Sequence, residues 1–333
     1  MRPALGGAVH GVLWQCDGAR ADAREPRVPG AATGNGVRAF ARSRRAGCCT
    51  SRARRSAPPI EALAAELRSG GGDPRPVSGG EVSARVPVVR GAASGLLEPE
   101  ARDIDAGGLV DGYLRLLRTR GGELRRNAEL RGIESWGSRL VAQFAGGELE
   151  AGTIVNAAGA WAGEVAWLAG ALPIGLAPLR RTAFTIDLPE GVEARAWPCV
   201  IDVEERLYFK PDAGRLLVSP ADETPSVPCD AQADDFDVAL AVERLEAMTS
   251  LRVTRVRARW AGLRTFAPDR TPLVGFDPRA PGFFWLAGQG GYGLQTSAAM
   301  ARAAAALATG SGWPADLAAQ GVRPEALAPD RYA

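Results

Sequence analysis

A glycine-rich segment near the C-terminus has the residue types and spacing of a loop that binds a cofactor. Residues 288–293 read Gly-Gln-Gly-Gly-Tyr-Gly and match the dinucleotide pattern G-x-G-x-x-[GA]. An apolar run precedes this segment and an alanine-rich stretch follows it, as expected of a strand, a loop and a helix. Glycines allow backbone N–H groups to approach a ligand, and a helix N-terminus favours partial negative charge. The segment is therefore a candidate cofactor loop.

The place of this loop in the chain limits its role. Only 40 residues follow Gly293, which is too few for a complete nucleotide-binding half with its ribose-binding acid. The loop is therefore either a tight turn packed by small residues or, as we favour, a second loop near the reactive end of a cofactor. A second match to the pattern, residues 34–39, follows Pro29 and no strand, and we reject it.

The sequence gives little support for catalysis or metal binding that depends on histidine. His10 is the only histidine and lies in a segment without regular patterning. Histidine-based acid–base catalysis, a Ser-His-Asp triad and a His-containing zinc site are therefore poorly supported, and we predict no metal site. A bound cofactor would have to carry the reaction.

The amino-acid composition indicates which broad class of protein this is. An apolar content of 46% and a net charge of +2 indicate a globular chain without the basic surface that nucleic acid requires. Five cysteines are an odd number, which predicts no disulfide framework and fits a reducing compartment. No apolar run approaches the roughly 18 residues of a membrane span, and no signal peptide is evident. We expect a cytoplasmic protein.

Residues 1–58 differ from the rest of the chain. They contain 11 arginines and three acidic residues, with neither helical nor strand periodicity. We therefore expect no folded core there. The stretch is either an organelle transit peptide or, as we favour, the product of a misread frame or a misplaced start in GC-rich DNA.

Regular patterning begins near Pro59 and predicts the elements that must position the loop. A short helix is expected over residues 60–70, a strand over 140–144 and an acidic helix over 236–248. Residues 153–170 predict a short buried strand, a turn of small residues and a helix, which is the unit of a doubly wound sheet. Between Asp105 and Gly121, apolar residues at helical spacing predict an amphipathic helix: Leu109, Val110, Tyr113, Leu116 and Leu117.

Several motifs, in this order and spacing, resemble the D-amino-acid oxidase superfamily of flavoenzymes. VNAAGAWA at residues 155–162 precedes WAGLRTFAPDRTPLVGF at 260–276 and WLAGQGGYGLQTSAAM at 285–300. With PLRRTAF at 178–184 and LYFKPDAGRLLVSPADE at 207–223, they look most like bacterial D-arginine dehydrogenase and its relatives. The resemblance runs from about Ile60 to the C-terminus. Nothing in residues 1–58 resembles the family, whose opening strand, glycine loop and ribose-binding acid are missing.

The resemblance implies a set of site residues. The positions at which the relatives bind a substrate carboxylate correspond here to Arg181, Tyr208 and Arg264. An arginine guanidinium group can bind a carboxylate through two parallel hydrogen bonds. Gly291 and Tyr292 would lie beside substrate and flavin. The remaining cofactor contacts implied are Gly290, Gly291, Gly293, Leu294, Gln295 and Thr296 at the isoalloxazine, Ala158 and Gly159 at the ribityl or pyrophosphate region, and Leu130 near the adenine. The alternative for each arginine is a structural salt bridge, and for Tyr208 a place in the core.

The implied fold is α/β (α+β), with an incomplete FAD-binding Rossmann-like domain built from discontinuous segments and a mixed-sheet substrate domain. We assign residues 59–163 to the FAD-binding domain with some substrate-domain elements. Residues 164–261 form the substrate domain, and residues 262–333 return to the FAD-binding domain. Residues 1–58 form an aberrant, disordered segment.

The implied function is FAD-dependent oxidation of a D-amino acid or a related amine. Hydride passes from the substrate α-carbon to flavin N5, giving an imino acid and then a 2-oxo acid and ammonia, with oxygen or a quinone as electron acceptor. Glycine or sarcosine oxidase and general D-amino-acid dehydrogenase remain open. The residues that select a cationic substrate in the D-arginine group fall within the unmatched stretch, so that preference is not carried over. The alternative is a non-catalytic, truncated or frame-shifted remnant that binds no flavin.

Overall fold

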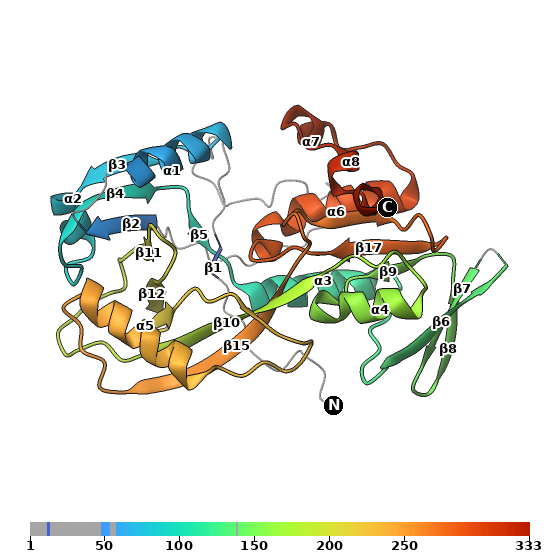
Figure 1. The fold of residues 1–333 in the computed structure, drawn as a ribbon, viewed down its shortest axis with the longest axis horizontal. Coiled ribbons are helices and arrows are strands. Elements are labelled where there is room, and N and C mark those ends of the chain that lie inside the picture. The colour runs from blue at the N-terminus through green and yellow to red at the C-terminus, as the bar shows by residue number, and fades with distance from the viewer. Residues whose placement is uncertain (1–11, 14–47, 54–57, 138) are drawn as a thin grey trace.

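The computed structural model describes residues 12–13, 48–53, 58–137 and 139–333, and Figure 1 shows how their helices and strands are arranged. The rejected glycine motif at residues 34–39, His10 and Cys16 lie outside the described residues. The helices are α1 (Pro58–Ser69), α2 (Gly79–Arg85), α3 (Ala106–Thr119), α4 (Ala162–Leu168), α5 (Asp235–Met248), α6 (Gly293–Thr309), α7 (Ala315–Ala319) and α8 (Pro324–Leu327), with 3₁₀ turns η1 (Gly159–Trp161) and η2 (Pro329–Tyr332).

A nine-stranded mixed sheet forms one half of the described molecule. Its order is β14-β10-β13-β12-β11-β2-β4-β3, and β15 pairs with β10. Strands β11 and β2 run parallel, whereas the other neighbours are antiparallel. The strands are β2 (Cys48–Ala53), β3 (Arg75–Ser78), β4 (Ala92–Glu98), β10 (Ala177–Ile186), β11 (Cys199–Asp202), β12 (Tyr208–Asp212), β13 (Arg215–Ser219), β14 (Thr224–Pro225) and β15 (Val256–Phe266).

Apolar side chains from this sheet pack against α2 and α5. Val82 of α2 and Leu245 of α5 are fully buried with Phe184 and Phe209 from the central strands. Burial of each large apolar side chain contributes roughly 1.5–3 kcal/mol. This buried core holds the strands of the sheet in place against α2 and α5.

A second mixed sheet has the order β16-β17-β9 and forms the other half, with α6 along one side and α4 along the other (Figure 1). Its strands are β9 (Ile154–Asn156), β16 (Leu273–Phe276) and β17 (Phe283–Ala287). Alternation along β17 sends Phe284 toward α6 and α8, and sends Phe283 and Trp285 toward α4. Both faces of β17 are buried, which explains its continuous apolar sequence.

Two small sheets complete the described structure. One contains β6 (Leu130–Trp136), β7 (Arg139–Phe144) and β8 (Gly147–Ala151), and the other pairs β1 (Val12–Leu13) with β5 (Arg102–Asp103). Among the described helices, none is long and apolar enough to cross a membrane.

Most predicted elements are confirmed. The helices expected after Pro59, after Asp105 and over residues 236–248 are α1, α3 and α5. The carboxylate of Asp105 caps α3 by accepting a 2.9 Å hydrogen bond from the backbone N–H of Gly108. The strand, loop and helix expected around residues 283–309 are β17 and α6. The α/β (α+β) class with mixed sheets is also confirmed.

Two expectations are wrong. Residues 48–53 were expected to lack regular structure, yet Cys48–Ala53 forms β2 between β4 and β11. The backbone hydrogen bonds of its two neighbours hold this strand, and they need no apolar alternation in its sequence. The strand at residues 153–155 was expected to be buried, but Val155 is 48% exposed, and β9 lies at the edge of its sheet, where β17 is its one partner among the described strands.

The predicted domain boundaries fall inside elements. Strand β15 continues past Ala261 to Phe266, and α4 begins at Ala162, before the boundary after Gly163. Strand β15 therefore connects the nine-stranded sheet directly to the half that carries the glycine loop.

Candidate functional site

Two arginines share one face of the nine-stranded sheet. Strands β10 and β15 are antiparallel, with Arg181 opposite Gly262 and Leu179 opposite Arg264. Opposite residues lie on the same face, and so do residues two apart along a strand. Arg181, Gly262 and Arg264 are therefore neighbours on one face. A Cβ atom placed on Gly262 would have no other atom within 4 Å, so the sheet face is open at Gly262, between the backbone positions of the two arginines.

Arg264 is a desolvated cation that is open to an anionic ligand. Burial, and then the like charge of Arg181, lower the pKa of the Arg264 guanidinium, which nevertheless stays protonated because an arginine pKa is so high. In the described part of the chain, no carboxylate forms an ion pair with Arg264. Removing a charge from water without a partner is costly, so a substrate carboxylate would relieve that cost.

The glycine loop lies against Arg264. A Cβ atom on Gly291 would approach Nη1 of Arg264 to 2.9 Å, which is closer than such contacts normally come. The absent side chain at Gly291 therefore leaves room for the guanidinium group. This contact joins the predicted carboxylate site to the predicted cofactor loop.

Arg181 and Tyr208 complete the group predicted from sequence. Arg181 Nε donates a 2.6 Å hydrogen bond to the backbone carbonyl of Asp222, and its Nη2 lies 3.3 Å from a carboxylate oxygen of Glu223. Tyr208, at the start of β12, is close enough to act on the pKa of Arg264. The structure thus gathers all three residues, although Arg181 already has an ion-pair partner in the protein.

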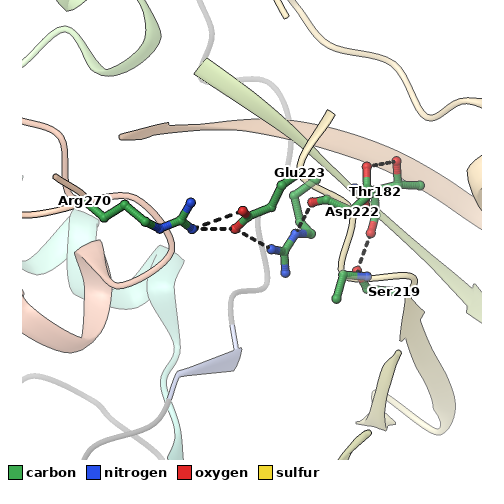
Figure 2. A network of polar contacts seen from close by, with 7 residues as sticks. Thr182, Ser219, Asp222, Glu223 and Arg270 are labelled. Carbon is green, nitrogen blue, oxygen red and sulfur yellow. Dashed lines mark hydrogen bonds and ion pairs between the residues drawn. The ribbon is translucent and has the colours of Figure 1, made fainter. Parts of the chain in front are cut away.

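A break in the sheet places Asp222 and Glu223 beside Arg181. Strands β13 and β14 both pair with β10 on the side away from β15, and the loop between them leaves the backbone of Thr182 without a strand partner on that side. Side chains replace those partners: Asp222 accepts from the Thr182 N–H at 2.7 Å and from its hydroxyl at 3.1 Å, and the Ser219 hydroxyl donates to the Thr182 carbonyl at 2.6 Å (Figure 2). Burial raises the pKa of Asp222.

Arg270 extends the polar network toward the glycine loop. Figure 2 shows it reaching Glu223, whose two oxygens lie 2.9 and 3.0 Å from Nη2 of Arg270. The Arg270 guanidinium also lies 4.0 Å from the centre of the Phe266 ring, a cation–π distance. That ring covers Gly290, where an added Cβ would come within 2.3 Å of it.

The two segments predicted to touch the flavin meet at one edge of the smaller sheet. Strands β9 and β17 are parallel, with Asn156 opposite Trp285, so the residues after each strand emerge at the same edge. Asn156 is buried and shapes the turn after β9, because its amide donates to the Ala162 carbonyl at 2.8 Å and accepts from Ala158 N–H at 3.3 Å. Ala158 and Gly159 therefore lie at the same edge as the glycine loop.

This edge has the features of a site for the predicted flavin. Gly159 has a φ of +56° and open space where a side chain would be. Helix α6 begins at Gly293 without a side-chain cap or an acidic residue in its first turn, so its free N–H groups favour an electron-rich ligand atom. The buried Oε1 of Gln295 has no hydrogen-bond partner among the described groups. The residues present therefore fit the cofactor.

The other predicted cofactor residues are less informative. Tyr292 is 57% exposed at the start of α6, and Thr296 donates its hydroxyl and backbone hydrogen bonds to the Tyr292 carbonyl. Gly293 and Leu294 lie in the first turn of α6. Leu130 begins β6, in a different sheet, and packs against the core around α4. The roles of these residues remain predictions.

Sequence reasoning missed the polar residues that surround the two arginines. Asp222 and Glu223 follow the LLVSP strand, and Arg270 lies within the segment WAGLRTFAPDRTPLVGF that was quoted for the resemblance. Their importance depends on contacts between residues 40 to 47 positions apart. No local spacing signals such contacts.

A cavity of about 730 Å³ lies elsewhere, between residues 187–195 and 210–215. Asp103 and the buried Lys210 line it and form a 2.7 Å ion pair with each other. None of its lining residues belongs to the glycine loop, and four of its charged lining residues already form ion pairs, Lys210 with Asp103 and Arg215 with Asp187. We therefore place the site at the arginines.

Comparisons with known proteins show which family the chain resembles. Residues 36–307 match the family model described as DAO, FAD dependent oxidoreductase. The match begins within residues 1–58, which corrects the expectation that nothing there resembles the family.

Individual relatives are more distant. The chain is 28% identical over 216 residues to hydrogen cyanide synthase subunit HcnC of Pseudomonas aeruginosa, covering 64% of this chain and 50% of the relative. It is 25% identical over 206 residues to human mitochondrial sarcosine dehydrogenase, covering 57% of this chain and 22% of that protein. The chain thus spans half or less of the length of these relatives.

Solved structures share the fold. Glycine oxidase from Geobacillus kaustophilus superposes with a TM-score of 0.71 at 21% identity, covering 85% of this chain and 76% of that chain. L-proline dehydrogenase from P. horikoshii gives a TM-score of 0.72 at 17% identity, covering 85% and 77%.

Proposed function

The chain belongs to the DAO family of FAD-dependent oxidoreductases, and we propose that it oxidises a small amino acid whose carboxylate is held by Arg264 and Arg181. The observation that carries this proposal is the desolvated Arg264, which lies beside the open space over Gly262 and next to Gly291. A guanidinium fork can bind a carboxylate through two parallel hydrogen bonds.

FAD, the cofactor of this family, supplies an acceptor for the hydride that leaves the substrate α-carbon. The residues that would hold its ring are Gly290, Gly291 and the first turn of α6, including Gln295. Ala158 and Gly159 would hold its chain, since they lie at the same edge of the sheet. Backbone N–H groups dominate this set, as glycine-rich contacts allow.

The protein's own residues bind and orient the substrate. Arg264 takes the carboxylate, Arg181 adds a second cation, and Tyr208 adds a hydroxyl donor without a competing charge. Held by its carboxylate, the substrate has its α-carbon fixed relative to the glycine loop. As hydride leaves that carbon, the amine releases a proton and an imino acid forms, which water converts to a 2-oxo acid and ammonia.

We further propose a D-amino acid as the substrate. The support is the likeness of the PLRRTAF, LYFKP and WAGLR motifs to D-arginine dehydrogenase. Sarcosine dehydrogenase among the relatives and glycine oxidase among the structures make glycine and sarcosine the other candidates. The electron acceptor is oxygen or a quinone.

A visible absorption spectrum of the purified protein tests the proposal first. Bound flavin gives yellow absorption bands, and anaerobic addition of the true substrate bleaches them. D-alanine, L-alanine, glycine and sarcosine would be compared at equal concentration, and faster bleaching by the D-enantiomer is expected. A protein that stays colourless after incubation with FAD would favour the alternative of a non-catalytic remnant.

A further inference from the structure

One of the protein's own carboxylates occupies a fork made by two arginines. Both oxygens of Glu223 lie within 3.0 Å of Nη2 of Arg270, and one of them is also 3.3 Å from Nη2 of Arg181. Two guanidinium groups around one carboxylate form a strong and specific arrangement for an anion. The chain thus contains a second carboxylate position, already filled.

This second position is continuous with the substrate site. Arg181 belongs to both, since it contacts Glu223 and shares a sheet face with Arg264. Arg270 is tied to the glycine loop, because it stacks on the Phe266 ring that covers Gly290. The side chains of Glu223 and Arg270 are 35% and 55% exposed, so a ligand could reach the fork from solvent.

The charged groups at the site have a net charge of +1, which one further carboxylate would neutralise. Arg181, Arg264 and Arg270 are cations, while Asp222 and Glu223 contribute carboxylates to the same network. One positive charge remains when all five groups are ionised. The first carboxylate of a bound ligand pairs with it, whereas a second carboxylate would meet Glu223 and be repelled.

We propose that Glu223 determines specificity by filling the position of a second carboxylate, so that the enzyme accepts amino acids with one carboxylate and rejects dicarboxylic ones. This inference rests on the proposed function, because it assumes that Arg264 takes the first carboxylate. A purely structural role is the alternative. The structure assigns that role to Asp222, whose hydrogen bonds to Thr182 hold the loop without help from Glu223.

The test compares binding of unreactive carboxylates by titration calorimetry. Propionate serves as the monocarboxylate, and malonate, succinate and glutarate serve as dicarboxylates. In Glu223→Ala, the best dicarboxylate should gain on the order of tenfold in affinity relative to propionate, since an exposed fork yields a moderate gain. Turnover should shift in the same direction, with kcat/KM for D-aspartate or D-glutamate rising relative to D-alanine.

Two further variants show whether the gain in dicarboxylate affinity comes from the vacated position between Arg181 and Arg270 or from the loss of one negative charge. Glu223→Ala combined with Arg270→Gln should lose the dicarboxylate gain, because the fork then has one guanidinium group. The charge-matched control is Glu150→Gln, which removes an exposed glutamate paired with Arg139 on β7, and it should leave the affinity ratio unchanged.

The outcomes distinguish this inference from the proposed function. An unchanged ratio in Glu223→Ala, or a gain that survives Arg270→Gln, overturns the role of Glu223 while the carboxylate site at Arg264 stands. A wild-type protein that binds flavin but no propionate overturns both.

Discussion

At the scale of single residues, two arginines on one sheet face differ in what they contact. Arg181 is held by the Asp222 carbonyl and by Glu223, whereas Arg264 has no ion-pair partner among the residues that the structure describes. The first is positioned by the protein, and the second is available to a ligand. Arg264 should therefore carry the larger share of substrate binding.

Replacing Arg264 tests that share. Arg264→Ala should lower kcat/KM by about 100-fold, mainly through KM, because a desolvated ion pair contributes about 2–3 kcal/mol. Arg264→Lys should recover part of the loss, since it keeps the charge without the planar fork. The flavin spectrum should be unchanged. Arg259→Ala on the same strand, whose partner is the exposed Asp235, is the control, and kinetics of Arg264→Ala equal to that control would remove the proposed role.

Gly291 offers an indirect test of the same group. Gly291→Ala would bring a methyl group to 2.9 Å from Nη1 of Arg264, and the flexible end of the arginine should move aside. We expect KM to rise about tenfold with little change in the free energy of unfolding. Gly163→Ala in α4, where no atom would lie within 4 Å, provides the comparison in steady-state kinetics. Equal KM values for the two variants would contradict the close approach of the loop.

At the scale of elements, the loop between β15 and β16 carries Arg270, and hydrogen bonds from the C-terminal turn η2 hold this loop. Arg331 of η2 donates to Asp269 at 2.8 Å and to the Thr271 carbonyl at 2.7 Å. Asp269 also accepts from the backbone N–H of Thr271 at 2.9 Å. These hydrogen bonds hold the residues on either side of Arg270, whose guanidinium group lies over the Phe266 ring.

The ion pair at Asp269 should make stability depend on pH. Hydrogen bonds from Arg331 hold the pKa of Asp269 well below its ordinary value of 3.8. A lowered pKa stabilises the folded state above about pH 4, and the contribution is lost as the pH falls through and below that value. Asp269→Asn should therefore reduce the free energy of unfolding by about 1 kcal/mol at pH 7, discounted for solvent exposure.

Urea unfolding at pH 7 and pH 3 measures this effect. The difference between wild type and Asp269→Asn should shrink at pH 3, whereas the exposed Asp230→Asn should show little difference at either pH. A difference that is equal at both pH values would argue against the ion pair as its cause.

At the scale of the whole molecule, the two halves meet where β15 ends. Phe266 forms a bridge with Gln289, and the Gly290 N–H donates to the Thr265 carbonyl at 2.8 Å. The glycine loop is thus attached both to its own sheet, through β17, and to the sheet that carries the arginines. A ligand bound at the loop should stabilise both halves together.

Adding FAD should raise the midpoint of thermal unfolding. A ligand that binds only the folded state stabilises it by RT ln(1 + [L]/Kd), or about 4 kcal/mol at 1,000 times Kd. The midpoint should rise with FAD concentration in a single transition, and equal concentrations of ADP should have a smaller effect because the ring contacts are absent. A midpoint independent of FAD would contradict the fit of the cofactor to this edge.

The sequence alone determined the local elements and the residue types of the site. Helical spacing and a capping aspartate predicted α3, and an apolar run before a glycine motif predicted β17 and α6. These signals are local, because capping, turn chemistry and amphipathic spacing act within a few residues. The motifs also singled out Arg181, Tyr208 and Arg264, which come from three strands of the nine-stranded sheet.

Only the tertiary structure decided which partners these residues have. Strand β2 has no apolar alternation and exists because β4 and β11 supply its hydrogen bonds. Glu223 and Arg270 are 47 positions apart, and their pairing depends on where the loops after β13 and β15 lie. Strand register and loop placement arise from packing over the whole chain, so no short window of sequence contains them.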